Sequence, residues 1–315
     1  MVGCLSLPSA VTTMRPDPLR YSLRQLEVFT AIADCGTTAA AAEALAMSQS
    51  AVSAALNTLE TSYDVSLFDR VGKRLRLNAM GQQLHPRAEA LLNEARQFDA
   101  ALSGGASNGD LTIAASFTIA NHVAVDYIAL WLQSYPDARI DISTGNSPDV
   151  VTKVLNAEVE LGMIEYHIDH PDLELIPWLE DELIVFCAPQ HQLAQRDVLT
   201  QQDIMTNRWV LREQGSGARL LFDRVFQPLL PSLPVFLEFR HNEPIRRAVE
   251  QGLGIGCLSQ KVLAAHFANG TLVPLTLPSE LRMQRTFYLC RRRQRYHRPA
   301  VLDFSALCGA ANVAH

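Results

Sequence analysis

The N-terminal part of the chain is organised around residues 48–60, which read SQSAVSAALNTLE. Val52, Leu56 and Leu59 fall at positions i, i+4 and i+7, which predicts a helix with one apolar stripe facing a core. Ser48 stands where an N-cap is expected. The opposite side carries uncharged polar side chains, at Gln49, Ser50, Ser53 and Asn57. Amides and hydroxyls of this kind suit the floor of a DNA major groove, where they read the edges of bases.

A second helix is predicted over residues 38–45, and only Ala46 and Met47 separate the two. Two helices joined so tightly predict a helix-turn-helix, whose second helix enters the groove. The alternative is an ordinary helical hairpin in a core, and these residues alone do not distinguish the two. An earlier helix is predicted to start with a capping box at Ser22 and to end at Gly36.

A short basic segment, RVGKRLRL, follows at residues 70–77. Its leucines alternate with charged residues, which predicts a hairpin with a basic tip. Beside a helix-turn-helix such a hairpin forms a wing that binds phosphate, here through Arg70, Lys73 and Arg74. The alternative is a solvated charged turn, and the adjacent helices favour the wing.

Residues 78–102 predict a long helix capped by Asn78. Its apolar residues recur in steps of four and three, as in a coiled coil, at Leu84, Ala88, Leu91, Ala95, Phe98 and Leu102. Pro86 is expected to bend the helix or to remove one hydrogen bond. A seam this narrow fits either an intramolecular helix pair or a dimer interface. We favour the dimer, because a small head needs a surface to pack against and two-fold DNA readers are usually dimers.

Composition restricts the class of protein. The chain has 315 residues, which suggests two domains, and its hydrophobic fraction of 48% is ample for buried cores. The net charge of −6 excludes a uniformly basic nucleic-acid binder, so DNA contact requires a local basic patch. Six cysteines without a CxxC pair predict reduced, mostly buried thiols. With neither a membrane-spanning run nor a signal peptide, we expect a cytoplasmic protein with a disordered tail over residues 1–20.

Beyond a glycine-rich hinge at residues 104–109, the pattern changes to alternating strands and helices. Strands are predicted at residues 111–116, 139–144, 160–164, 183–189, 209–212, 235–239, 254–258 and 287–290, and one helix is predicted from about residue 117 to 134. Such β–α repeats predict a mainly parallel sheet with helices on both faces. Residues 110–309 are expected to form two lobes around a cleft, lobe I at about 110–184 and 276–309 and lobe II at about 185–275.

The head resembles the LysR family of bacterial transcriptional regulators. The matching segments are SLRQLEVFTAIADCG (22–36), AAAAEALAMSQSAVSAALNTLE (39–60), LFDR (67–70) and RLNAMG (76–81), with a weaker match at QGLGIGCLS (251–259). The resemblance implies an α/β protein with a winged helix-turn-helix head (21–81) and a long linker helix that dimerises (82–104). It further implies a two-lobed, periplasmic-binding-protein-like effector domain (110–309).

The resemblance also implies the partners. A protein of this family binds double-stranded DNA at an interrupted palindrome near a promoter, contacts RNA polymerase and forms a homodimer, here through the linker helix, and a homotetramer. It works in the cytoplasm in association with the nucleoid, and a small effector changes DNA bending. The family often has Pro, Arg and Phe where this chain has Ser50, Ala54 and Thr38. Loss of the arginine removes one contact, so Gln49 and Ser53 are the stronger candidates for base reading.

Within the family, several segments look most like the YeiE-type branch, which is linked to sulphite and to sulphur or iron metabolism. These segments are TIAN (118–121), TGNSPDV (144–150), WLEDELIVFCAP (178–189) and REQGSGAR (212–219). The likeness favours sulphite or a related oxyanion as the effector.

The effector site can also be argued from the residues. In open α/β sheets, ligands gather at the carboxyl ends of strands, where free N–H groups of helix N-termini favour anions. The candidates are Ser116, Thr118, Asn146, Ser147, Glu165, Arg212, Gly215 and Ser216. The alternative is that the hydroxyl and amide residues only cap helices. Glu165 beside an anion requires either that Arg212 neutralises it or that the ligand is protonated. The third alternative is that Glu165 and Arg212 form a pair without ligand contact.

We predict neither an enzyme nor a bound cofactor. No base or acid can be paired with Ser216. The possible metal ligands Glu165, His167, Asp169 and His170 lie in a predicted loop without a further cluster, so we predict no metal there. The rival interpretation is a small-molecule binding protein or a hydrolase built on the α/β half. An exported binding protein should carry a signal peptide, and a hydrolase should offer paired acid and base groups in the cleft.

Overall fold

The computed structural model describes residues 18–72, 74–102, 109–293 and 297–311. Lys73, most of the predicted tail and most of the predicted hinge therefore lie outside the described residues. The chain divides into two compact units, and the division falls between Leu92 and Asn93. The first unit contains α1 (Leu23–Cys35), α2 (Thr38–Ala44), α3 (Gln49–Tyr63), β1 (Phe68–Val71), β2 (Arg74–Leu77) and the first half of α4 (Ala79–Leu102).

The helices of the head begin where the sequence predicts, but α3 continues beyond the predicted segment to Tyr63. Ser22 and Gln25 form the capping box of α1, and Gly36 ends that helix with φ of 73°, in the left-handed region. Ser48 caps α3, because its hydroxyl accepts from the N–H of Ala51 at 3.2 Å. The apolar stripe of α3 is buried in a core shared with α1, whose members include Phe29, Ile32, Val52, Leu56 and Leu59.

The wing and the linker helix also form as expected. β1 and β2 pair antiparallel, with Phe68 opposite Leu77. Asn78 accepts from the N–H of Gly81 at 2.9 Å and so caps α4. A Cβ at Gly81 would lie 2.1 Å from the carbonyl oxygen of Leu67, which explains why a glycine stands where the helix meets the base of the wing. α4 runs through Pro86 without a break in its assignment.

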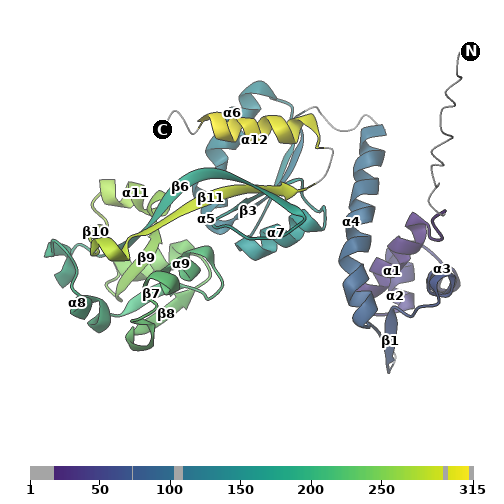
Figure 1. Cartoon of the computed structure of the whole chain (residues 1–315), viewed down its shortest axis with the longest axis horizontal. Coiled ribbons are helices and arrows are strands. Elements are labelled where there is room, and N and C mark those ends of the chain that lie inside the picture. The colour runs from purple at the N-terminus through teal and green to yellow at the C-terminus, as the bar shows by residue number, and fades with distance from the viewer. Residues whose placement is uncertain (1–17, 73, 103–108, 294–296, 312–315) are drawn as a thin grey trace, which may run out of the picture. The chain divides into compact units, whose positions relative to one another are not determined.

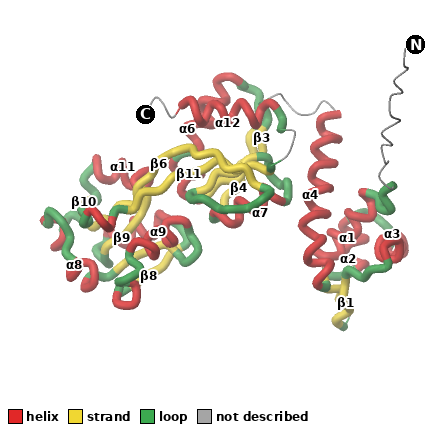
Figure 2. The backbone as a smooth tube through the Cα atoms, viewed as in Figure 1, coloured by secondary structure: helices red, strands yellow, loops and turns green. Residues whose placement is uncertain are grey.

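The second unit contains the end of α4 and a mixed sheet with helices on both faces (Figures 1 and 2). Its strands are β3 (Leu111–Ser116), β4 (Ile140–Gly145), β5 (Leu161–Ile164), β6 (Leu173–Cys187), β7 (Trp209–Arg212), β8 (Val235–Phe239), β9 (Ile255–Ser259), β10 (Val273–Leu275) and β11 (Met283–Arg292). Its helices after α4 are α5 (Phe117–His122), α6 (Ala124–Ser134), α7 (Ser147–Leu155), α8 (Gln201–Thr206), α9 (Gly217–Val225), α10 (Asn242–Glu250), α11 (Gln260–Ala268) and α12 (Pro299–Ala311). The described strands follow the order β4-β3-β5-β11-β6-β9-β7-β8, and β10 pairs with β6.

Two long antiparallel strands connect the two halves of this unit. β6 and β11 pair from Leu183 opposite Met283 to Leu173 opposite Arg292, and Figure 2 shows them crossing from one group of strands to the other. One half packs α6 and α12 on one face of its strands and α7 on the other, and the second half packs α8 and α9 opposite α10 and α11. Each half therefore has its own core, as two lobes require.

Three predictions about this unit are wrong in detail. The sheet is mixed, because β6, β10 and β11 run antiparallel to their neighbours. The helix predicted to run to residue 134 is two helices that meet at Val123. The strand predicted at 183–189 is the end of β6, which begins at Leu173 and ends at Cys187, and the strand predicted at 287–290 lies within β11, from Met283 to Arg292. Polar residues on the exposed sides of both strands interrupt the apolar pattern, so their full length was not predicted.

The described cysteines fit the prediction of reduced thiols. Cys187, Cys257, Cys290 and Cys308 are buried and unpaired, while Cys35 is exposed. Cys4 lies outside the described residues. Burial raises the pKa of the Cys187 thiol to about 11. The buried thiols act as small apolar side chains of the cores.

Candidate functional site

The face of α3 opposite its apolar stripe is exposed. Gln49, Ser50, Ser53 and Asn57 all lie on it, and no charged side chain interrupts these four positions. Gln49 Nε2 donates to Thr38 Oγ1 at 3.3 Å, and the hydroxyls of Ser48 and Ser50 are 3.0 Å apart. These contacts are local and exposed. The side chains can exchange them for contacts with an external partner at little cost.

The wing, in the same compact unit as α3, presents exposed cations. Arg70 and Arg74 are exposed, and within the described residues neither forms an ion pair. The N–H of Leu75 donates to the carbonyl of Gly36 at 2.9 Å, which ties β2 to the end of α1. The wing is thus fixed at its base while its guanidinium groups remain in solvent, where they can bind phosphate.

The predicted effector residues lie at the carboxyl ends of strands, and most of them are buried. Ser116 precedes α5, Ser147 begins α7, Glu165 follows β5, and Arg212 ends β7. These four, together with Thr118 and Ser216, are at most 3% exposed. The structure therefore places six of the eight candidates in the interior, where polar groups need partners.

Three of the candidates lie in helix caps or loops. Asn146 forms the capping box of α7 with Asp149, as the alternative interpretation proposed. Gly215 is exposed, with φ of 88° in the turn before α9. Ser216 caps α9, since its hydroxyl accepts from the N–H of Arg219 at 3.2 Å. Capping and ligand binding are compatible at Ser216, because the other N–H groups of that helix end remain available.

The predicted partner of Glu165 is wrong. Its carboxylate accepts from Arg285 Nη1 at 2.5 Å, and Arg285 Nε donates to Asp181 at 2.8 Å. Ser259 completes the group by donating to Asp181 at 2.6 Å. Burial raises the pKa of Glu165, but the charge of Arg285, the hydroxyl of Ser116 and the charge of Arg212 outweigh it, so the pKa is lowered. Glu165 is therefore ionised and neutralised from β11.

Arg212 has a different role. Its Nε donates to Glu213 at 2.9 Å and its Nη1 donates to Asn242 at 3.0 Å. Asn242 in turn donates to Thr118 at 3.5 Å, which joins the first helical residue of α10 to α5 across the two lobes. Sequence analysis missed Arg285, Asp181, Asn242 and Ser259. Only Arg285 could have been found from the sequence. It is a charged residue on the same side of a strand as the apolar residues Met283 and Phe287, which predicts a buried charge that needs a partner.

The two lobes also approach closely at Gly217. A Cβ there would lie 2.9 Å from the Cβ of Glu165 and 3.1 Å from a ring carbon of Tyr166. The N-terminus of α9 therefore lies directly against the carboxylate at the end of β5. A ligand that binds between these elements has to displace contacts that already exist.

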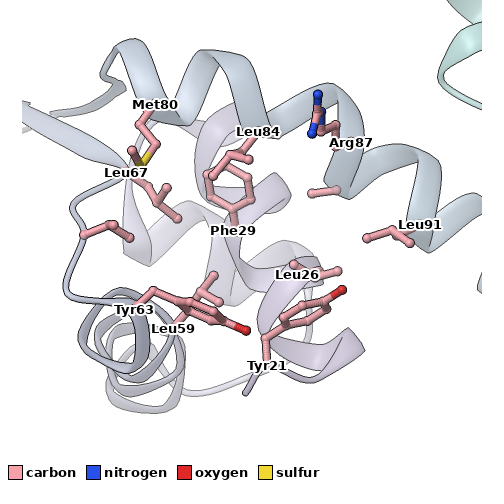
Figure 3. A pocket seen from close by; sticks show the side chains of 12 residues that line it. Tyr21, Leu26, Phe29, Leu59, Tyr63, Leu67, Met80, Leu84, Arg87 and Leu91 are labelled. Carbon is pink, nitrogen blue, oxygen red and sulfur yellow. The ribbon is translucent and has the colours of Figure 1, made fainter. Parts of the chain in front are cut away.

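The linker helix presents apolar side chains next to a groove of the head. The groove, of about 400 Å³, is lined by residues of α1, α3 and α4, including Phe29, Tyr63, Leu84 and Leu91 (Figure 3). Leu84, Leu91, Phe98 and Leu102 are exposed, Ala95 is partly exposed, and Ala88 is buried in the core of the head. Ala88 thus packs within its own chain, and the remaining seam residues offer surface to a partner.

Two family models match this chain. The LysR substrate binding domain matches residues 104–312, and the bacterial regulatory helix-turn-helix protein of the lysR family matches residues 23–82. The chain belongs to the LysR family of bacterial transcriptional regulators. This finding confirms the resemblance and the fold class, and it identifies a transcription regulator with a DNA-binding head and an effector-binding domain. The rival interpretation as an enzyme is excluded, because the matching families are regulators.

Relatives of this LysR-type regulator match most of its length. It is 41% identical to the uncharacterized HTH-type transcriptional regulator YeiE of Escherichia coli K12, over 94% of this chain and 99% of the relative. It is 31% identical to the transcriptional regulator CysL of Bacillus subtilis, over 76% of this chain and 80% of that protein.

Solved structures share the fold of this regulator. Full-length CbnR complexed with its target DNA is 18% identical, with a TM-score of 0.65 over 91% of this chain and 98% of CbnR. The effector binding domain of QuiR in complex with shikimate is 21% identical, with a TM-score of 0.59 over 66% of this chain and 99% of that domain. Among the described helices of the LysR-type regulator, none has the length and apolar composition needed to cross a membrane.

Proposed function

We propose that this regulator reads an interrupted palindrome near a promoter through α3 and the wing. Gln49, Ser50, Ser53 and Asn57 contact bases, while Arg70, Lys73 and Arg74 contact phosphates. The observation that carries this assignment is that one compact unit holds both the exposed, uncharged face of α3 and exposed guanidinium groups, which form no ion pairs among the described residues. Amide and hydroxyl groups discriminate bases, and cations on a wing bind any sequence.

The effector is a small oxyanion held at the ends of β3, β4, β5 and β7. Support comes from the N-termini of α7 and α9, where Ser147 and Ser216 are buried. Because Arg285 is shared between Glu165 and Asp181, these three groups sum to one negative charge. The anion must therefore be held by N–H groups and hydroxyls rather than by a spare cation. The resemblance to the YeiE-type branch favours sulphite.

Effector binding is coupled to DNA through movement of the lobes. Thr118 contacts Asn242, and Gly217 contacts Glu165, across the lobes, so a ligand between these elements changes the separation of the lobes. The protein acts as a homodimer through the linker helix, with Leu84, Leu91, Ala95, Phe98 and Leu102 at the seam, and as a homotetramer. A change in lobe angle then changes the spacing of the DNA heads and the contact with RNA polymerase.

Thermal unfolding of the purified protein against sulphite, sulphate, thiosulphate, phosphate and simple carboxylates tests the effector. A ligand at 100 times its dissociation constant adds about 2.7 kcal/mol of stability. A selective rise with sulphite supports both the oxyanion class and its identity, whereas a rise with another anion supports the class alone. If no anion raises the stability, the effector assignment is contradicted. The DNA assignment is tested separately, by substitutions in α3 and the wing.

A further inference from the structure

A side-chain cluster outside both sites lies where the head meets the linker helix. Asp34 is in the last turn of α1, and His85 and Glu89 are one turn apart on α4. One ligand atom from each of the three residues lies within 4.8 Å of the other two. His85 Nε2 is 3.8 Å from Asp34 Oδ1, and His85 Nδ1 is 3.6 Å from Glu89 Oε2.

The imidazole of His85 is held in place while the carboxylates remain accessible. Its ring packs edge-on against Phe29, with 5.9 Å between the ring centroids. The side chain of His85 is 17% exposed, compared with 68% for Asp34 and 32% for Glu89. His85 Nε2 is buried without a hydrogen-bond partner among the described residues, which leaves one strong donor or acceptor unused.

The two carboxylates approach different nitrogens of the imidazole ring. The separations of 3.6 Å at Nδ1 and 3.8 Å at Nε2 exceed the range of about 2.7–3.2 Å for hydrogen bonds. One ion binds only one of these nitrogens, so the carboxylate beside the other nitrogen has to rotate towards it. One ligand atom from each residue already lies within 4.8 Å of the other two, and two ligands about 2.1 Å from a tetrahedral ion are about 3.4 Å apart. Rotation of the accessible carboxylates therefore brings one imidazole nitrogen and two oxygens around one ion.

We propose that Asp34, His85 and Glu89 form a binding site for a divalent transition-metal ion such as Zn²⁺. An imidazole with two carboxylates suits borderline ions, whereas Mg²⁺ and Ca²⁺ prefer oxygen ligands alone. Two ligands at i and i+4 share one face of α4, and the third comes from α1, so the ion crosslinks the two helices. Water completes the coordination.

The position of the site gives it a consequence for DNA binding. Asp34 is two residues from Gly36, whose carbonyl accepts the N–H of Leu75 in the wing. Thr37 then caps α2, the first helix of the helix-turn-helix. An ion between Asp34 and α4 therefore fixes the recognition elements on the linker helix and makes their orientation dependent on metal supply.

The experiment uses the full-length protein after removal of metals with a chelator. Calorimetric titration with Zn²⁺ and the absorption spectrum of bound Co²⁺ measure binding, and circular dichroism in chelator verifies folding. We expect one equivalent of metal per chain at this site, lost in Asp34→Asn, His85→Gln and Glu89→Gln. The Asp34 and Glu89 substitutions change accessible carboxylates, so they keep the test valid if His85→Gln disturbs packing against Phe29.

His266 provides a matched control. Its Nδ1 lies 3.7 Å from Glu250, much like the His85–Glu89 pair, but this pair belongs to no three-ligand group among the described residues. His266→Gln should retain the bound equivalent and the Co²⁺ spectrum. Binding that is unchanged in all three cluster variants would overturn the proposal. The proposal would also be overturned if the unaltered protein bound no equivalent of metal and the three substitutions only lowered Tm in chelator. The cluster would then be an ion pair alone.

Discussion

The recognition face of α3 and the buried cluster at the strand ends are both polar, yet they are built in opposite ways. On α3, Gln49 and Ser53 are exposed and make at most local contacts. At the strand ends, Glu165 and Arg212 are buried and satisfied by other side chains. The first surface can bind a partner without rearrangement, whereas a ligand at the second has to compete with internal contacts. Only the second is therefore able to convert binding into a change of conformation.

The largest expected effect comes from removing the cation that neutralises the buried cluster. Arg285→Met leaves Glu165 and Asp181 buried without their partner, which should lower the unfolding free energy of the second unit by about 3–5 kcal/mol. All three tryptophans of the chain, Trp131, Trp178 and Trp209, lie in this unit. Urea unfolding followed by tryptophan fluorescence therefore reports on it directly.

A neighbouring arginine supplies the control for that experiment. Arg282, the residue before β11, pairs with Glu182 of β6 at 3.2 Å, but its side chain is 58% exposed. Arg282→Ala should change the unfolding free energy by only about 0–1 kcal/mol. If both substitutions lowered the unfolding free energy equally, the buried Glu165–Arg285–Asp181 group would contribute no more to stability than an exposed ion pair.

The second effect concerns DNA and should leave the fold unchanged. Gln49→Ala should weaken operator binding by about 1–3 kcal/mol and relax base preference, because the amide that reads base edges is lost. Thr58→Ala, nine positions later and hence on the opposite side of α3, is the control. Fluorescence anisotropy with operator and scrambled DNA measures both variants. If Gln49→Ala binds the operator normally, the assignment of this face to the groove is wrong.

The features of the head could be predicted from the sequence, whereas the side-chain partners at the strand ends could not. Local signals located the head, because capping by Ser22 and Ser48, the stripe containing Val52 and the turn at Gly36 all act within a few residues. The positions of Ser147 and Ser216 at helix N-termini were predicted for the same reason. Features set by local backbone chemistry can be read from one segment at a time.

The partner of Glu165 could not be found in this way. Arg285 lies 120 residues further along the chain, and the contact depends on how β11 pairs with β5 and β6. The sequence favours Arg212 as the partner of Glu165, since it is nearer along the chain than Arg285, but Arg212 donates to Glu213 and Asn242. Side-chain partners across a sheet follow from strand register, which the sequence alone left open.

A smaller and less specific effect is expected at the wing. Arg74→Ala should weaken binding to all DNA sequences alike and reduce the slope of log Kd against log salt concentration by about 1, because one phosphate contact is lost. Arg139→Ala removes an exposed arginine from the second unit and should leave the slope unchanged. A change of base preference in Arg74→Ala would instead assign this side chain to base reading.

The last prediction concerns how the unfolding free energy depends on pH, and Glu165 determines it. The expected difference appears only in acid. Its pKa in the folded protein lies below the ordinary value of 4.5, despite burial, because of Arg285 and the neighbouring hydroxyl of Ser116. The stabilisation from its charge is therefore fully present above about pH 4.5 and is lost as the pH falls below this value through the folded pKa. Glu165→Gln has no proton to bind at this position.

We therefore expect the unfolding free energy of Glu165→Gln to fall less steeply below pH 4.5 than that of the unaltered protein. Urea unfolding from pH 3 to pH 6, followed by tryptophan fluorescence, measures the two slopes, and other acidic groups cancel in their difference. Parallel curves would mean that the pKa of Glu165 is the same in the folded and unfolded states, so that Arg285 does not stabilise its charge. A steeper fall in Glu165→Gln would mean that burial raises the pKa and keeps Glu165 protonated in the folded protein. Arg285 would then be neutralised by Asp181 alone, and the cluster would carry no net charge.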